Sequence, residues 1–301
     1  MLENKAGPIE IMGPKRFNWV AFIFLTTMPV IAVTAAIMYI SHYGFAWSDV
    51  FVFSIMSVMT GLAITGGYHR YYSHRAYDCH PVVQLYYMVI GAASVQNSLL
   101  NWASNHRYHH RYVDDEADPY NINKGFFWAH MGWIFYDDMP GARTFSNLED
   151  LKKSKLVMWQ HRYYPLLAVV FGFGLPTLIG AMFGRPLGGL IFGGLIRMLW
   201  IHHCVYLINS AAHVFGKRPY SNQHTAKDNW FLAFFTYGEG YHNYHHTYPS
   251  DYRNGVRWYQ WDPTKWWIRG LELCGLATNL KRTTKERRDR VTVNPTYVEA
   301  P

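Results

Sequence analysis

Charged side chains are scarce in this 301-residue chain. Only 16% of its residues are charged, whereas about 25% are charged in ordinary soluble domains, and half of the chain is hydrophobic. This shortage argues against an ordinary soluble protein. The mean hydropathy is nevertheless slightly negative, at −0.12. A sizeable polar part therefore lies outside any segment that is buried in a membrane.

Cysteine pairs are also lacking, because Cys79, Cys204 and Cys274 are widely spaced and form no CxxC motif. This spacing excludes a disulfide framework. The net charge is +8, but the basic residues are scattered around apolar runs, which argues against nucleic acid as a partner. Aromatic residues are abundant at 18%, as in proteins at membrane–water interfaces, and most of the 16 histidines are clustered.

Four long apolar runs predict four transmembrane helices, at about 19–40, 50–68, 166–183 and 187–209. A helix needs about 20 apolar residues to cross a bilayer. The runs are joined in pairs by short loops, so two antiparallel hairpins are expected. The predicted fold class is an all-α membrane protein in which one large domain, 19–280, follows a polar segment, 1–18. Residues 69–163 and 210–280 form a helical cap, and 281–301 form a flexible basic tail.

Lysine and arginine are distributed unevenly around these runs. Three precede the first run, ten lie in 69–163 and thirteen follow residue 209, whereas the two short loops carry none and one. The positive-inside rule therefore predicts that both termini and the cap face the cytoplasm. A fifth apolar stretch, 81–100, is expected to pack at the interface or in the cap core, because as a span it would separate the histidines on its two sides.

Nine histidines form a candidate metal site. They occur in an HxxxxH motif at the end of the second run, in HxxHH motifs at 106–110 and 242–246, and after Asn-Ser-Ala-Ala at the end of the fourth run. Residues three and four apart share a helix face. Nine imidazoles suit two octahedral-leaning ions, although imidazole binds Fe, Zn, Cu and Ni alike. A proton relay and a zinc hydrolase site are the alternatives. The nine are His69, His74, His106, His109, His110, His213, His242, His245 and His246.

Together these motifs resemble the membrane fatty-acyl desaturases, in particular the Δ9 acyl-CoA (stearoyl-CoA type) subgroup. HRYYSH, HRYHH and HNYHH resemble the three histidine boxes of that family. The flanking Asp118-Pro119, NSAAH at 209–213 and Gly-Glu-Gly at 238–240 resemble it as well. The resemblance covers about residues 20–280.

The resemblance implies an O₂-dependent oxidoreductase of unsaturated fatty acid biosynthesis. It would insert a cis double bond, at Δ9, into a saturated long-chain acyl-CoA or acyl-lipid. Two Fe²⁺ ions would be held by the nine histidines, and Asn209 would reach one of them through a water. Side chains alone cannot attack an unactivated methylene, which is consistent with a metal cofactor. The substrate-binding residues implied are Ser57, Gly61, Gln96, Asn97, Trp102, Lys124, Arg218 and Tyr220.

Departures from the family pattern bear on the substrate. Ser104 and Asn123 stand where the animal enzymes carry basic residues that contact CoA phosphates, which keeps acyl-lipid and carrier-protein substrates open beside acyl-CoA. Ser57 and Gly61 are small where bulk closes the family's acyl tunnel, so acceptance of long chains is expected.

Two electrons must come from a separate donor of the cytochrome b5 or ferredoxin/rubredoxin type, because the sequence has neither an HPGG haem motif nor a Gly-rich dinucleotide motif. A bacterial plasma membrane is expected rather than the endoplasmic reticulum. The alternatives are a histidine-box alkane or lipid hydroxylase, and a metal-handling transporter. A transporter would need polar residues near the bilayer midplane, which the first and third runs lack.

Overall fold

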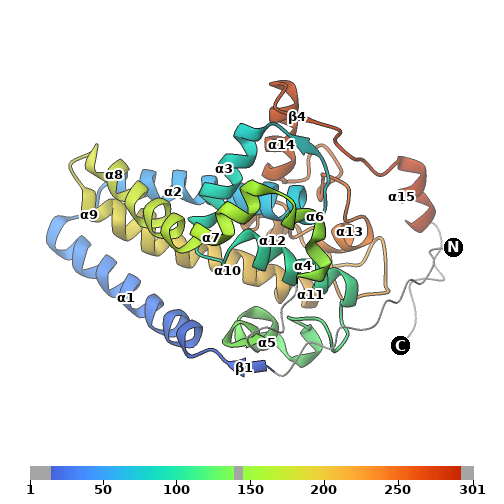
Figure 1. The fold of residues 1–301 in the computed structure, drawn as a ribbon, viewed down its shortest axis with the longest axis horizontal. Helices are drawn as coiled ribbons and strands as arrows, with labels where there is room; N and C mark the ends of the chain where they lie inside the picture. The colour runs from blue at the N-terminus through green and yellow to red at the C-terminus, as the bar shows by residue number, and fades with distance from the viewer. Residues whose placement is uncertain (1–14, 139–144, 293–301) are drawn as a thin grey trace.

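The computed structural model describes residues 15–138 and 145–292. Within them, four helices are long and apolar enough to span a membrane: Trp19–Tyr43, Trp47–Ser73, Lys155–Ala181 and Pro186–Val214. Figure 1 shows these helices running side by side from the cap to the opposite end of the molecule, where both hairpin loops lie. The prediction of a four-helix integral membrane protein with a helical cap is confirmed.

The spanning helices are not uniform α-helices. The first is α1 (Trp19–Tyr43), and the second joins α2 (Trp47–Leu62) to a π-helix, η1 (Ala63–Ser73). The third consists of α7 (Lys155–Val169), a π-helix η5 (Val170–Gly174) and α8 (Leu175–Ala181). The fourth consists of α9 (Pro186–Gly188), a π-helix η6 (Gly189–Ile196), α10 (Arg197–Asn209) and α11 (Ala211–Val214).

The third helix begins eleven residues before the predicted start at 166. Ser154 caps α7 by accepting a hydrogen bond from the backbone N–H of Val157, which starts the helix at Lys155. Pro165 therefore lies inside the helix rather than before it. A proline removes one backbone hydrogen bond but does not always end a helix that is packed against its neighbours.

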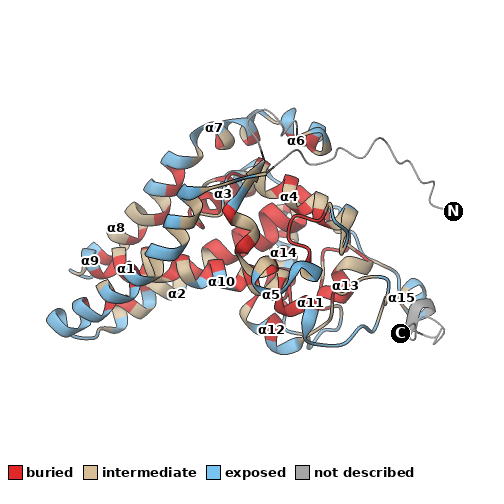
Figure 2. Ribbon diagram, turned by 90° about the horizontal axis from the view of Figure 1, so that it is seen from below, coloured by how far each residue is buried: buried red, intermediate tan, exposed pale blue. Residues whose placement is uncertain are grey.

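At the end far from the cap, close backbone packing holds the two helices of the second hairpin together, and an ion pair joins the two hairpins. A Cβ atom on Gly189 would lie 2.2 Å from the carbonyl oxygen of Pro176, so only glycine fits there. Arg185, in the loop of the second hairpin, forms an ion pair of 2.9 Å with Asp49 at the start of α2. In Figure 2, exposed residues dominate the outer faces of α1 and α8, and many of these are apolar, as is typical of helices that face lipid.

The cap consists of short helices, which surround the ends of the second and fourth spanning helices that lie far from the hairpin loops. Its helices are α3 (Pro81–Ala92), α4 (Leu99–Tyr112), η2 (Ile122–Lys124), α5 (Phe126–His130), η3 (Gly132–Phe135), η4 (Ser146–Leu148), α6 (Glu149–Lys152), α12 (Trp230–Phe235), α13 (His242–Thr247), α14 (Pro263–Leu273) and α15 (Lys285–Thr292). Two short antiparallel pairings join β1 (Lys15–Phe17) to β3 (Tyr136–Asp138) and β2 (Asp78–Cys79) to β4 (Ala277–Thr278).

Helix α3 packs in the main hydrophobic core, as expected for the fifth apolar stretch. Tyr87 and Met88 are completely buried there. The backbones of α3 and η1 approach closely, because a Cβ atom on Gly67 would lie 2.5 Å from the Tyr87 ring and one on Gly91 would lie 2.4 Å from the Tyr68 ring. With twelve residues, α3 is too short to span a bilayer.

The predicted flexible tail is ordered over its first part, which corrects that expectation. The backbone of Lys281 bonds Ala76 and Tyr252, and the backbone N–H of Thr283 donates to Asp251. Helix α15 follows, and its Arg287 carbonyl accepts from the hydroxyl of Tyr248. Residues 293–301 lie outside the described part, as does most of the predicted polar segment 1–18.

Candidate metal centre and adjoining cavity

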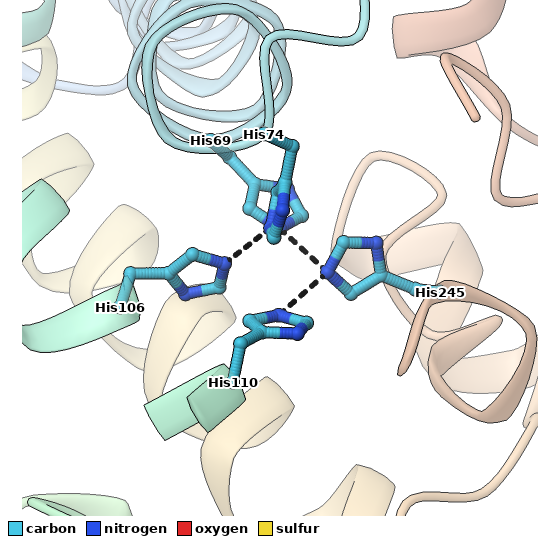
Figure 3. Close-up of side chains that lie close together, drawn as sticks. All are labelled: His69, His74, His106, His110 and His245. Carbon is cyan, nitrogen blue, oxygen red and sulfur yellow. Dashed lines mark hydrogen bonds between the residues drawn. The ribbon is translucent and has the colours of Figure 1, made fainter. Parts of the chain in front are cut away.

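The structure brings all nine predicted histidines together in two groups. The five-histidine group is His69, His74, His106, His110 and His245, and the four-histidine group is His109, His213, His242 and His246. In each group, the nitrogens that can bind a metal lie within 4.8 Å of one another. Figure 3 shows the rings of the five-histidine group pointing from three separate segments toward one centre.

The two HxxHH motifs are interleaved between these groups. The 106–110 motif, on α4, gives its outer pair to the five-histidine group and its middle histidine to the four-histidine group. The 242–246 motif, on α13, does the reverse. Both motifs are helical as predicted, but the three rings of one motif do not serve one ion. Each helix therefore contributes to both groups.

A π-helical turn explains the HxxxxH spacing. In an α-helix, residues five apart point about 140° away from each other. The backbone N–H of His74 instead bonds the carbonyl of His69, 3.1 Å away, as in a π-helix. This wider turn brings both rings to the same side of the helix, where each joins the five-histidine group.

Buried carboxylates orient one histidine of each group. His69 places its Nδ1 3.0 Å from Glu239, which also pairs with Arg70 at 2.9 Å. His109 places its Nδ1 2.9 Å from Asp118. A histidine that donates Nδ1–H to a carboxylate presents an unprotonated Nε2, and these Nε2 atoms face the centres of the groups.

A third histidine is oriented through a hydroxyl. The Nδ1 of His213 lies 2.7 Å from the Thr225 hydroxyl, which donates to Asp114. These orienting residues were not predicted from the sequence. The acidic residues in Asp118-Pro119 and Gly-Glu-Gly at 238–240 were its available signals, since a buried acid beside a histidine box is suited to this role.

Burial lowers the pKa of six of the imidazoles well below its usual value, and the neighbouring imidazoles lower it further. The six are His74, His106, His110, His242, His245 and His246. These rings are therefore neutral, which is the form that binds a metal ion. Neutral rings with converging bare nitrogens leave a cation as the partner that fits between them.

A cavity of about 440 Å³ lies between the cap and the start of α1, and it reaches the five-histidine group. Four of the predicted residues line it, together with His106: Gln96, Asn97, Trp102 and Asn209. The indole of Trp102 stacks on the His106 ring, with centroids 5.0 Å apart. A ligand in the cavity would therefore contact the group that holds the metal.

The loop between α3 and α4 lines the cavity. Val95 and Asn97 both have positive φ angles, 58° and 77°, a conformation that is strained for a β-branched residue such as valine. The loop is held in this shape by the spanning helices, because His202 bonds the carbonyl of Val95 and Tyr164 accepts from the backbone N–H of Asn97.

The other predicted substrate residues lie outside this cavity. Lys124 is on the surface, where it pairs with Glu116, and Arg218 is exposed. Tyr220 packs edge-on against Tyr244.

The expectation of an open tunnel end beside Ser57 and Gly61 is corrected by the structure. The ring of Tyr237 fills the space beside Gly61, and its hydroxyl donates to the carbonyl of Ser57. The small residues on α2 therefore make room for a tyrosine from the cap rather than for a longer tunnel.

Comparison with known proteins places this geometry in a family. The fatty acid desaturase family model matches residues 45–275. Acyl-CoA desaturase 1 of Saccharomyces cerevisiae is 40% identical over 89% of this chain and 52% of the relative. Stearoyl-CoA desaturase 4 of Mus musculus is 34% identical over 94% of this chain and 80% of the relative. The sn-1 stearoyl-lipid 9-desaturase of Anabaena variabilis is 31% identical over 90% of this chain and 97% of the relative.

The chain spans about half the length of the yeast relatives that it matches. The matched residues nevertheless include all nine clustered histidines and the four predicted substrate or metal-site residues that line the cavity. The chain belongs to the fatty acid desaturase family.

Proposed function

We propose that this protein is an O₂-dependent, di-iron fatty-acyl desaturase that inserts a cis double bond at Δ9 into a saturated long-chain acyl substrate. The observation that carries the proposal is the contact between the cavity and one of two all-imidazole groups. Two relatives are named for desaturation at position 9, the sn-1 stearoyl-lipid 9-desaturase and the Delta-9 acyl-lipid desaturase 1 of Arabidopsis thaliana, and they support this double-bond position.

The spacing of the nitrogens supports an octahedral-leaning ion over tetrahedral zinc. Neighbouring ligands at about 2.1 Å from an ion lie about 3.0 Å apart at right angles and about 3.4 Å apart in a tetrahedron. The Nε2 atoms of His69 and His245 are 3.0 Å apart, and those of His110 and His245 are 2.9 Å apart. In the four-histidine group, His109 and His246 are separated by 3.1 Å. These separations suit ligands at right angles.

The two groups differ in the number of imidazole ligands that they offer. Around six-coordinate ions, the five-histidine group would leave one ligand position open and the four-histidine group would leave two. Asn209 lines the cavity, and we propose that it would reach one of the ions through a water. When bound, two reduced iron ions supply the O₂-activating chemistry that removes hydrogens from an unactivated methylene. Trp102 and the strained 94–97 loop orient the alkyl chain and exclude water from the reacting carbons.

Partners and topology form part of the same proposal. The acyl group arrives from the membrane on CoA or on a lipid, and O₂ and two electrons complete the reaction. The chain's net charge of +8 suits an acidic electron carrier of the cytochrome b5 or ferredoxin/rubredoxin type. The lysine and arginine distribution supports a cap that faces the cytoplasm, with both termini on that side. A bacterial plasma membrane stays a prediction.

The test is to express the chain in a desaturase-deficient host and to analyse total fatty acids by gas chromatography and mass spectrometry. His109→Ala is the matched control, because it removes one imidazole of the four-histidine group. A cis-monoene that appears only with the wild-type chain supports desaturation, and double-bond mapping checks Δ9. A hydroxylated product would instead identify a hydroxylase. Purified protein that contains neither iron nor another transition metal would contradict the di-iron proposal.

A further inference from the structure

Another histidine, His224, lies beside the four-histidine group, although it is not one of the nine predicted ligands. Its ring centroid is 5.2 Å from that of His246. Within the group, the distance between ring centroids is 4.4 Å for His242 and His246 and 5.5 Å for His213 and His246. His224 is therefore as close to His246 as some members of the group are.

Both ring nitrogens of His224 are buried, and neither bonds any residue in the described part of the chain. Buried polar side-chain atoms almost always have a hydrogen-bond partner, in the protein, in ordered water or in an ion. No protein contact fixes the tautomer of this ring, so the nitrogen that faces the metal site can either donate or accept a hydrogen bond. Such an imidazole is suited to a small ligand at the neighbouring centre.

Residues that build the metal site also hold the loop around His224. The hydroxyl of the next residue, Thr225, lies 2.7 Å from Nδ1 of His213. Asn243, within the second HxxHH motif, donates to the carbonyl of Ala226 at 2.9 Å. The chain that follows His224 is thus bonded to two segments that carry metal ligands, and the place of its ring beside the group is a fixed feature of the fold.

The distances between nitrogens distinguish a direct ligand from a residue that acts through a water. Two imidazole nitrogens bound to one ion at about 2.1 Å can lie at most about 4.2 Å apart. His224 does not join the four-histidine group, whose metal-binding nitrogens all lie within 4.8 Å of one another. This larger separation excludes direct binding of the same ion in this arrangement, whereas a bridging water spans such a gap.

We infer that His224 holds a water in one of the ligand positions that the four-histidine group leaves open. This inference rests on the proposed di-iron function. In this role His224 is a positioning residue, because it contacts the water rather than the ion. An anion that replaces the water accepts a hydrogen bond from the same ring, so the affinity of the site for a small anion reports the contact.

Azide binding to the oxidised, iron-loaded protein tests the inference, because azide displaces water from a ferric ion and the complex is coloured. His224→Leu removes the donor and is expected to raise the Kd for azide about 10-fold to 100-fold, the effect of losing one hydrogen bond to a charged group. His224→Gln keeps an N–H donor and is expected to restore much of the affinity. Both variants are expected to keep the iron content of the wild-type chain, because His224 binds no ion directly.

The loss of the imidazole is expected to be tolerated by the fold, because its nitrogens bond no described residue and none loses a partner. His224→Phe keeps a flat ring without nitrogens and repeats the test where leucine packs poorly. Gln223→Leu is the matched control, since it changes the neighbouring residue of the same loop, whose side chain is exposed. This control is expected to keep the wild-type Kd for azide.

The outcomes separate this inference from the proposed function. Wild-type azide affinity in both His224→Leu and His224→Phe, or an equal loss in Gln223→Leu, would overturn the role of His224 while the di-iron proposal stands. Loss of one ion per chain from His224→Leu would also overturn it, since that result would make His224 a direct ligand. Wild-type protein that takes up no iron would overturn the proposed function and this inference with it.

Discussion

Replacement of Glu239 by glutamine is expected to weaken one metal site and spare the other. Glu239 is buried and contacts His69, a member of the five-histidine group, through one carboxylate oxygen. Its other oxygen accepts two hydrogen bonds from Arg70. The substitution keeps the size of the side chain but removes the charge that favours a metal-binding His69.

The magnitude follows from these contacts. Loss of a carboxylate partner of a metal-bound histidine weakens metal binding by about 10–100-fold, or about 1.4–2.7 kcal/mol. Arg70 keeps a second carboxylate, Asp262, at 2.9 Å. The cost to folding therefore stays below the about 3–5 kcal/mol of an unpaired buried charge. A loss of metal with modest loss of stability is expected.

Asp262→Asn is the control, because Asp262 belongs to the same cluster but touches no histidine. It accepts from Arg70 and also caps α14 through the backbone N–H of Lys265. Iron is measured by mass spectrometry after a fixed exposure to chelator. We expect two ions per wild-type chain, one for Glu239→Gln, and two for Asp262→Asn with a lower melting temperature. Equal iron loss in both variants would refute the orienting role of Glu239.

Three further results are expected. Asp118→Asn should weaken metal binding about 10–100-fold at the four-histidine group, which His109 joins, and chelator competition should show that one ion is lost first. Arg197→Met removes buried hydrogen bonds to the carbonyls of Ala93 and Gly172, so thermal unfolding in detergent should show a loss of about 3 kcal/mol or more; an unchanged melting temperature would contradict this. In metal-free protein, the six buried imidazoles have a pKa in the folded state below the unfolded value of about 6.5. Their contribution to stability is therefore present above pH 6.5 and is lost as the pH falls. The melting temperature at pH 5.5 should be lower than at pH 7.5, and equal melting temperatures would count against neutral, buried rings.

The sequence was sufficient for features that repeat with the period of a helix. Apolar runs gave the four spans, and the HxxHH spacing gave two helices whose histidines point inward. Features that depend on a change of helical period were not predictable in this way. The pairing of His69 with His74 needs a π-turn, and the early start of α7 needs a proline that is tolerated inside the helix.

Contacts between segments that are far apart in the sequence were the second kind of feature that could not be predicted from it. Gly61 and Ser57 indicate an open tunnel when the α2 sequence is considered alone, because both side chains are small. The residue that fills the space lies about 180 positions later in the chain. The side chain of Tyr237 could be placed only once the loop before Gly-Glu-Gly had been located against α2.

The metal centre depends on the same helix packing that holds the cap together, because the ligands of the two groups alternate along the same helices. Since α4 and α13 each give ligands to both groups, displacement of either helix would open both metal sites. The first hairpin contributes His69 and His74, whereas the second contributes His213, so neither hairpin completes a centre alone. Arg70 lies one residue after His69 and binds acids from two later loops. The same turn of η1 therefore supplies a metal ligand and fixes the cap that carries the others, which places the centre at the junction of the hairpins, beside the cavity.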